Sequence, residues 1–262
     1  MNMKEFSCFG EDGGGGNPAL VIEDGPREDE ERARLAREHA LTCVFLDAPG
    51  APGLAATLDF VYPHMRSPLC LHATLAAAQV LFARFGDASP LQVRTAMRGQ
   101  RLVLSREGEL VFVQLARQDA PQAAADAALA RRLLAAPGLQ LAGSPRLASV
   151  GSPKLLLEVA DRETLHGLTP DLEAIVEWGR AQGVSGCYVW YRIGEQEYEG
   201  RNFNHLDPRL EDSATGVAAG ALTAALGHGL TLHQGRASGR ACLMHTMIDG
   251  DAVFVGGRAV AC

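Results

Sequence analysis

The sequence is poor in aromatic residues and in positive charge. Phe, Trp and Tyr make up 6% of its 262 residues. Lys and Arg together number 24 against 31 Asp and Glu, which leaves a formal net charge of −7. A protein that reads the nucleic-acid backbone needs a basic stripe, and an acidic chain does not supply one. We therefore expect no nucleic-acid partner.

Long apolar runs are also missing. A membrane-spanning helix needs about 20 consecutive apolar residues, and no run in the chain reaches that length. The first residues, Met1 to Glu5, lack the apolar core of a secretory signal and reach an acidic residue early. These features predict no membrane partner and a cytoplasmic location.

Paired cysteines are absent. The six cysteines are scattered, and none forms a C-x-x-C pair: Cys8, Cys43, Cys70, Cys187, Cys242 and Cys262. This spacing is typical of reduced thiols rather than of a disulfide framework or a zinc site. Cys70 and His72 could begin a metal site, but no third or fourth ligand stands at a recognisable spacing. We expect no bound metal.

The chain does have enough apolar material for a full core, at 47% of its residues. Short apolar strands and helices interleave along it without a steady β-α-β rhythm, which favours an α+β fold over a parallel α/β fold. Residues 118–141 favour helix with breaks at alanine, proline and glycine, and they are expected to form a crossing between two halves. The expected helices cover residues 27–39, 73–84, 161–167, 170–182 and 214–226. The expected strands lie near residues 4–9, 18–23, 42–46, 54–62, 91–95, 101–105, 109–115, 154–159, 186–193, 240–247, 252–255 and 258–261.

A weak internal repeat links the two halves. Residues 72–77 resemble residues 213–218, and the two Ala-Thr pairs stand 141 positions apart (214 minus 73). Each pair opens a helix of small residues, and a helix N-terminus offers unsatisfied N–H groups to an anion. Small side chains let a ligand approach the backbone closely. The segments therefore predict a carboxylate site that includes Ala73, Thr74, Ala214, Thr215 and Gly216.

Four side chains near these helices could carry chemistry. His72 can act as a general acid or base, or it can simply pack at the helix start. Asp212 can be catalytic, or it can cap the helix together with Ser213. Cys43 and Cys70 can be reactive thiols if a helix N-terminus lowers their pKa, or they can be small buried hydrophobes.

Five stretches of the chain, in order, resemble the PhzF-like isomerases of phenazine biosynthesis, which are relatives of diaminopimelate epimerase. The stretches are residues 16–21, 69–78, 211–216, 234–240 and 250–260. The resemblance implies two similar α+β halves, each a mixed sheet or barrel around a central helix, with the active site between them. It assigns residues 1–118 to the N-terminal half, completed by the last strand near 256–262, and residues 119–255 to the C-terminal half.

The resemblance also implies a reaction. Family members are usually homodimers without metal or organic cofactor, and they move protons at carbon next to a carboxylate. The substrate would be a small-molecule carboxylic acid. His72 and Asp212 stand where the family has its active-site histidine and aspartate, and Asn17 lies in a matched stretch and is predicted to bind substrate.

Three positions depart from the family pattern. Cys43 stands in place of the catalytic glutamate, Leu71 in place of a glycine, and Val217 in place of a serine. If Cys43 replaces the glutamate as a proton-transfer group, the chain is an isomerase or epimerase. If it does not, the same scaffold can bind small acids without catalysis. A third hypothesis is a thiol-dependent enzyme that uses Cys70 or Cys43 as a nucleophile.

Overall fold

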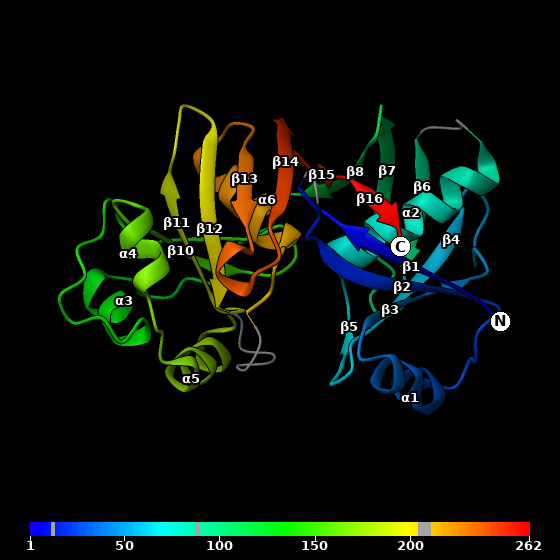
Figure 1. Cartoon of the computed structure of the whole chain (residues 1–262), viewed down its shortest axis with the longest axis horizontal. Coiled ribbons are helices and arrows are strands. Elements are labelled where there is room, and N and C mark those ends of the chain that lie inside the picture. The colour runs from blue at the N-terminus through cyan, green and yellow to red at the C-terminus, as the bar shows by residue number, and fades with distance from the viewer. Residues whose placement is uncertain (12–13, 87–89, 204–210) are drawn as a thin grey trace. The chain divides into compact units, whose positions relative to one another are not determined.

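A computed structural model describes residues 1–11, 14–86, 90–203 and 211–262, and it divides into two compact units (Figure 1). Unit 1 consists of Met1–Leu115 and Gly256–Cys262, and unit 2 of Ala116–Val255. The C-terminal strand thus belongs to the unit that contains the N-terminus.

Unit 1 is a mixed sheet with two helices. Its strand order is β16-β1-β2-β3-β4-β6-β7-β8, and β5 pairs with β4. The β2–β3 and β4–β6 pairs are parallel, and the other pairs are antiparallel. The elements are β1 (Asn2–Cys8), β2 (Asn17–Glu23), α1 (Asp29–His39), β3 (Thr42–Asp47), β4 (Ala56–Val61), β5 (Arg66–Ser67), α2 (Leu71–Phe85), β6 (Leu91–Thr95), β7 (Arg101–Glu107), β8 (Leu110–Ala116) and β16 (Ala259–Ala261).

Unit 2 is built the same way, with the order β9-β10-β11-β12-β13-β14-β15. Its β10–β11 and β12–β13 pairs are parallel, whereas β9–β10, β11–β12 and β13–β14 are antiparallel. The elements are α3 (Ala127–Leu133), β9 (Arg146–Ala148), β10 (Lys154–Glu158), α4 (Arg162–Gly167), α5 (Leu172–Gln182), β11 (Cys187–Arg192), β12 (Glu197–Phe203), α6 (Gly216–Leu226), β13 (Thr231–Gln234), the 3-10 helix η1 (Arg236–Ser238), β14 (Cys242–Asp249) and β15 (Ala252–Gly257).

The two units repeat one topology. The pairs β1–β2 and β9–β10 are antiparallel, β2–β3 and β10–β11 are parallel, and β3–β4 and β11–β12 are antiparallel. The next pairs along each sheet, β4–β6 and β12–β13, are parallel. In sequence, the long apolar helix α2 lies between β4 and β6, and α6 lies between β12 and β13. The Ala-Thr pairs therefore open corresponding helices. The fold class is α+β, as the sequence predicts.

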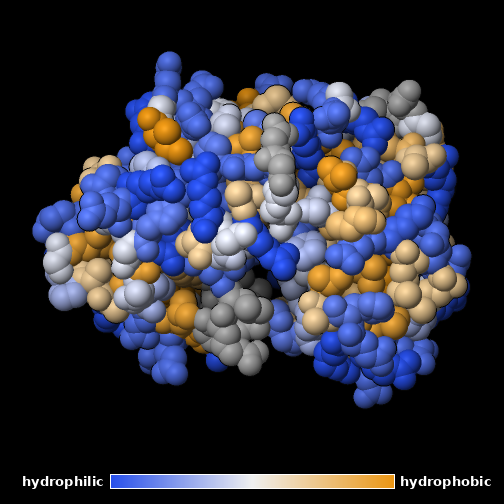
Figure 2. All heavy atoms as spheres, viewed as in Figure 1, coloured by the Kyte–Doolittle hydropathy of each residue, from blue (hydrophilic) through white to orange (hydrophobic). Residues whose placement is uncertain are grey.

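Burial separates α2 and α6 from the outer helices. Both are apolar on nearly all sides, and most of their residues are buried, which is typical of a helix inside a core. In α6, small residues permit close packing: a Cβ on Gly220 would lie 2.8 Å from a methyl group of Val150. By contrast, α1 buries one side only, and Figure 2 shows hydrophilic side chains over it at the lower right.

The stretch over residues 118–141, expected to be helix-forming with breaks, is helical only in part. Only α3 is helical there; it begins after Asp126, whose carboxylate accepts a hydrogen bond from the backbone N–H of Leu129. It ends at Leu133, and the next residues are Leu134 and Ala135, the latter with a φ of 49°. Pro121 and Pro137 lack the N–H group that a continuous helix needs.

The strands β12 and β13 were not expected from the sequence. Their residues include glycine, charged and polar side chains that have low strand propensity. Tertiary pairing overrides that propensity, since β12 is hydrogen-bonded between β11 and β13. Among the described residues, no helix is both long and apolar enough to cross a lipid bilayer.

Candidate functional site

His72 lies in the first turn of α2 and is 5% exposed. Its ring atom Nδ1 lies 3.4 Å from Nδ2 of Asn17, on β2, and 3.3 Å from Sγ of Cys70, the N-cap residue of α2. An amide nitrogen can only donate a hydrogen bond, so Nδ1 accepts and the ring proton lies on Nε2. The local structure thus leaves Nε2–H as the group that His72 can offer to a ligand.

Ala73 and Thr74 follow in the same turn and are fully buried. The backbone N–H and the hydroxyl of Thr74 both donate to the carbonyl oxygen of Cys70, at 2.9 and 2.7 Å. The Thr74 hydroxyl therefore fixes the start of the helix. No side chain caps this end of α2. We call Asn17, Cys70, His72, Ala73 and Thr74 the His72 half-site.

Cys43 lies on β3 in an apolar cluster beneath α1, and none of its surface is exposed. The cluster also contains Leu20, Ile22, Leu35, Ala36, Phe45 and Val61. Burial raises the pKa of the Cys43 thiol to about 11. A carbon base would need the thiolate, and these surroundings favour the neutral thiol. The catalytic role of Cys43 stays a prediction.

Asp212 lies before α6 and is partly exposed. Its Oδ2 accepts a hydrogen bond of 2.7 Å from the hydroxyl of Thr215. The N-cap position belongs to Thr215, three residues later, and no side chain caps the helix. The expected alternative, in which Asp212 and Ser213 cap α6, is therefore not what the structure shows.

Gln234, at the end of β13, holds this segment in place. Its Nε2 donates to the carbonyl oxygen of Asp212 at 2.7 Å and lies 3.1 Å from the Thr215 hydroxyl. Its Oε1 accepts from the N–H of Thr215 at 3.3 Å and from the Tyr188 hydroxyl at 3.2 Å. We call Asp212, Ala214, Thr215, Gly216 and Gln234 the Asp212 half-site.

Arg201 fixes the residue just before Asp212. Its guanidinium forms two parallel hydrogen bonds to the carboxylate of Glu211, at 2.9 and 2.8 Å. A third nitrogen donates to the carbonyl oxygens of Leu165 and Leu168, at 2.9 and 3.0 Å. Bidentate pairs of this kind restrict orientation, so the entry into the Asp212 segment is anchored to β12 and to the chain after α4.

Sequence reasoning assigned no role to Gln234 or Arg201. Gln234 lies in a matched family stretch, which was the only available signal. Arg201 carried none, because its partners are backbone carbonyls and a carboxylate ten residues away.

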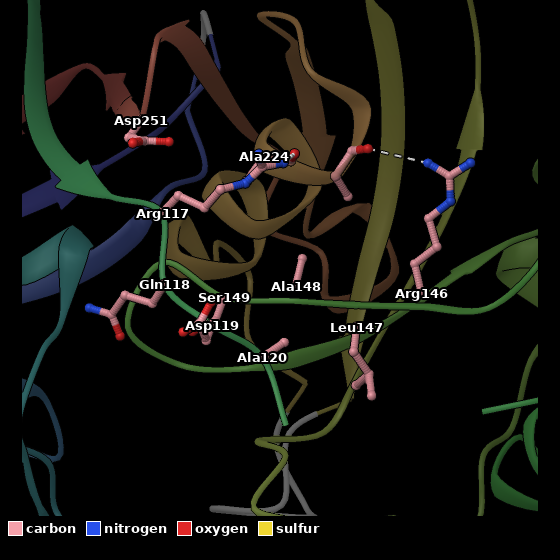
Figure 3. Close-up of a pocket in the computed structure, with 11 residues that line it drawn as sticks. Arg117, Gln118, Asp119, Ala120, Arg146, Leu147, Ala148, Ser149, Ala224 and Asp251 are labelled. Carbon is pink, nitrogen blue, oxygen red and sulfur yellow. Dashed lines mark hydrogen bonds between the residues drawn. The ribbon is translucent and has the colours of Figure 1, made fainter. Parts of the chain in front are cut away.

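A cavity of about 600 Å³ lies elsewhere in unit 2, at the C-terminal end of α6 (Figure 3). Arg117 donates to the carbonyl oxygen of Ala224, and Arg146 donates to that of Ala225 at 3.2 Å. These cations lie at the negative end of the helix dipole, which gives them a structural role. None of the sequence-predicted site residues lines this cavity.

Within the described ranges, no group of three or more His, Cys, Asp or Glu side chains comes together in a way that could hold a metal ion. The polar groups gathered in the two half-sites are instead a histidine, a carboxylate, amides and helix N-termini. These are groups that transfer protons and stabilise negative charge.

The family model for phenazine biosynthesis-like protein, PhzC-PhzF, matches residues 6–262. The chain belongs to this family. An uncharacterized isomerase from Deinococcus radiodurans is 32% identical over 256 residues, which cover 90% of this chain and 80% of that one.

Solved structures agree with this assignment. A predicted epimerase, PA4716, from Pseudomonas aeruginosa has a TM-score of 0.82 and 25% identity, and the match covers 99% of this chain and 96% of that one. A probable proline racemase from Agrobacterium radiobacter has a TM-score of 0.66 at 11% identity, covering 99% and 90% of the two chains. The second likeness concerns the fold alone.

Proposed function

We propose that the protein is an isomerase or epimerase that moves a proton at the carbon next to the carboxylate of a small acid, without metal or organic cofactor. The observation that carries the proposal is the orientation of Asp212. Thr215 holds its carboxylate and Gln234 holds its backbone, at the uncapped N-terminus of a buried helix. A fixed, partly exposed carboxylate before a helix N-terminus that no side chain caps suits removal of a proton from carbon.

In the proposed reaction, the Asp212 carboxylate accepts the proton from the substrate carbon. The electron pair of that C–H bond passes into the substrate carboxylate, which becomes an enediolate. Backbone N–H groups at the starts of α2 and α6 stabilise the added negative charge. Nε2–H of His72 donates a hydrogen bond to the enediolate and keeps its proton. Protonated Asp212, after exchange with solvent, returns a proton to carbon, which restores its carboxylate. The two half-sites are thereby proposed to act on one substrate.

Cys43 enters this scheme as a neutral group. A thiol with a pKa near 11 can donate a proton but does not serve as a base at neutral pH. The same finding favours the alternative of a small-acid-binding protein without catalysis, because the family glutamate is then not replaced by an equivalent base.

Solvent exchange separates the two functions. The protein is incubated in D₂O with a panel of small α-amino and β,γ-unsaturated carboxylic acids, and deuterium at carbon is followed by proton NMR. An isomerase exchanges at least one acid, and Asp212→Asn abolishes that exchange. Asp119→Asn, which changes an exposed acid of the same unit, is the matched control and keeps it. Binding of an acid without exchange would establish the binding protein instead.

The homodimer and the cytoplasmic location expected from the sequence also stay proposals. Light scattering on the purified chain tests the first, and fractionation of the producing cells tests the second.

A further inference from the structure

Lysine is almost absent from the chain. Its 24 basic residues are 22 arginines and two lysines, Lys4 and Lys154. Lys4, on β1, is exposed, whereas Lys154, the first residue of β10, is only 1% exposed. Arginine stays charged under all ordinary conditions, but a buried lysine can lose its proton. The deeply buried cation of unit 2 is therefore the type that can change its charge.

The surroundings of Lys154 compensate its charge poorly. Its ammonium has three N–H donors, and its one hydrogen-bond partner among the described residues is the carbonyl oxygen of Ser185. No carboxylate of the described part lies within ion-pair distance of it. Burial lowers the pKa of Lys154 to about 8, and the charge that most opposes this shift is that of Asp212.

Asn202, on β12, is a second unusual polar group. It is 0% exposed, and within the described residues neither Nδ2 nor Oδ1 of its side chain has a hydrogen-bond partner. Buried amides are almost always hydrogen-bonded, because an unpaired one loses the free energy of its contact with water. An orphaned amide at this depth therefore calls for a functional explanation.

The sheet register places Lys154 and Asn202 on one face of the sheet. Leu156 pairs with Tyr188, and Tyr188 pairs with Asn202, so the three side chains share one face of the sheet. Asn202 also forms an antiparallel bridge with Asp212, and residues opposite each other in such a bridge have neighbouring side chains. Lys154 precedes Leu156 by two positions and shares that face.

Other charged groups near Lys154 are few. Asp212 lies in the segment before α6, Cys187 and Tyr188 come from β11, and Arg146 of β9 pairs in register with Leu156. The helix α6 packs on this side and contains no titratable residue. Burial raises the pKa of Cys187 to about 12 and that of Tyr188 well above its usual value, so both are neutral near pH 8.

We propose that Lys154 and Asn202 are positioning residues for Asp212: the buried ammonium and the uncommitted amide stabilise its ionised carboxylate, and this support is lost when Lys154 gives up its proton. The inference rests on the proposed function, in which Asp212 is the base. It adds a nearby cation that can lose its charge, supplied by one of the two lysines in the chain.

The first test needs no substrate. The full chain is labelled with ¹³C at lysine Cε, which gives two signals, and both are followed between pH 6 and pH 11. We expect the Lys154 signal to titrate near pH 8, about two units below the ordinary lysine pKa of about 10.4. If Lys154 titrates at the ordinary lysine pKa, the proposal is overturned, whatever the activity of Asp212.

The second test follows Asp212 itself. The carboxyl carbons of aspartate are labelled, and Asp212→Asn identifies the signal. In the wild type this signal should move as Lys154 titrates, and in Lys154→Met or Asn202→Leu that movement should be lost or reduced. An unchanged titration in both variants would contradict the proposal. If neither variant folds, the wild-type titration still tests the proposal. An Asp212 signal that does not change as Lys154 titrates overturns the proposal.

Exchange kinetics distinguish positioning from mere structural support. Lys154→Met should lower kcat about tenfold with little change in KM, and it should remove the decline of rate near pH 8. Lys154→Arg, which keeps the charge, should retain activity above pH 8, and Lys4→Met should behave as the wild type. Equal losses in Lys154→Arg and Lys154→Met, with an unchanged pH profile, would contradict the charge role. Full exchange in Asp212→Asn would instead count against the proposed function.

Discussion

At the scale of single residues, Cys43 shows how burial limits chemistry. The thiol lies in an apolar cluster and its pKa is raised to about 11, so almost none of it is thiolate at neutral pH. Cys262 is the exposed cysteine of the described chain. We predict that iodoacetamide at pH 7.5 alkylates Cys262 and leaves Cys43 unmodified in the folded protein. Peptide mass spectrometry measures both, and equal rates at the two sites would show that Cys43 is a reactive thiol.

Lys154 has a consequence for stability as well. Its pKa is lower in the folded protein, at about 8, than in the unfolded chain, at about 10.5. Below pH 8 Lys154 is protonated in both states, and the buried charge lowers the free energy of unfolding by about 3 kcal/mol. Between pH 8 and 10.5 the unfolded chain binds more protons than the folded protein, so the free energy of unfolding rises with pH. The penalty is gone above that window.

We therefore predict a pH-dependent gap between the wild type and Lys154→Met. The variant lacks a buried cation and should be more stable at pH 7, and its advantage should shrink by about 2 kcal/mol at pH 9.5. Urea unfolding at the two pH values measures the gap. Lys4→Met is the control and should follow the wild type. A gap of constant size would mean that Lys154 does not titrate in this window.

At the scale of elements, α1 is tied to its sheet by a buried ion network. Arg32 of α1 is 5% exposed and donates to Asp47 at 2.6 Å and to Asp59 at 2.7 Å; the Asp59 side chain has no exposed surface. Arg32→Leu leaves Asp59 with Arg66 as its remaining ion-pair partner among the described residues. Removing Arg32 leaves buried carboxylate charge without its partner, so we predict a loss of about 3 kcal/mol in the free energy of unfolding.

Arg34 on the same helix is the matched control for this prediction. It pairs with Glu38 at 3.6 Å, and both side chains are more than half exposed. Arg34→Leu should change the free energy of unfolding by less than about 0.5 kcal/mol. Denaturant unfolding of both variants decides: similar small effects would show that the Arg32 network does not hold α1.

The connection between β13 and α6 depends on Gln234. Its side chain, which is fully buried, hydrogen-bonds Asp212, Thr215 and Tyr188. Gln234→Leu keeps the side-chain volume but leaves several polar groups without their hydrogen-bond partner. We therefore predict a loss of about 3 kcal/mol in the free energy of unfolding, and a lower kcat because Asp212 is misplaced. Gln118→Leu, at an exposed position, should change neither. Unfolding and exchange measured on both variants test this, and a full exchange rate in Gln234→Leu would contradict the positioning role.

At the scale of the whole molecule, the sequence predicted the class of fold and the two central helices well. Apolar helices of small residues, and strands in which apolar and polar residues alternate, can be recognised from the local sequence. The family motifs also follow one another along the chain in the order of the family. Over residues 118–141 the sequence predicted helix with breaks but not its extent, because alanine content indicates helix throughout while proline interrupts it and α3 alone forms. The strands β12 and β13 were missed because their residues are held by neighbouring strands rather than by their own propensity.

The site was predictable only where motifs carried it. His72 and Asp212 stand in matched stretches at the starts of corresponding helices. The matched stretch contains Gln234 but does not show that its side chain binds the Asp212 segment. The burial of Lys154 and Asn202 has no sequence signal, because it depends on register between strands that are far apart in the chain. The apolar surroundings of Cys43 likewise follow from its place under α1.

The central claim is the proposal that Asp212 and His72 take part in one reaction. Solvent deuterium exchange into an accepted acid, measured for Asp212→Asn, for His72→Gln and for the double variant, tests it most directly. Each single change should lower the rate about 10²–10⁴-fold, and the double variant should be no slower than the slower single one, because groups that act together are not additive. If the two losses multiply, or if Asp212→Asn exchanges at the wild-type rate, the account is contradicted.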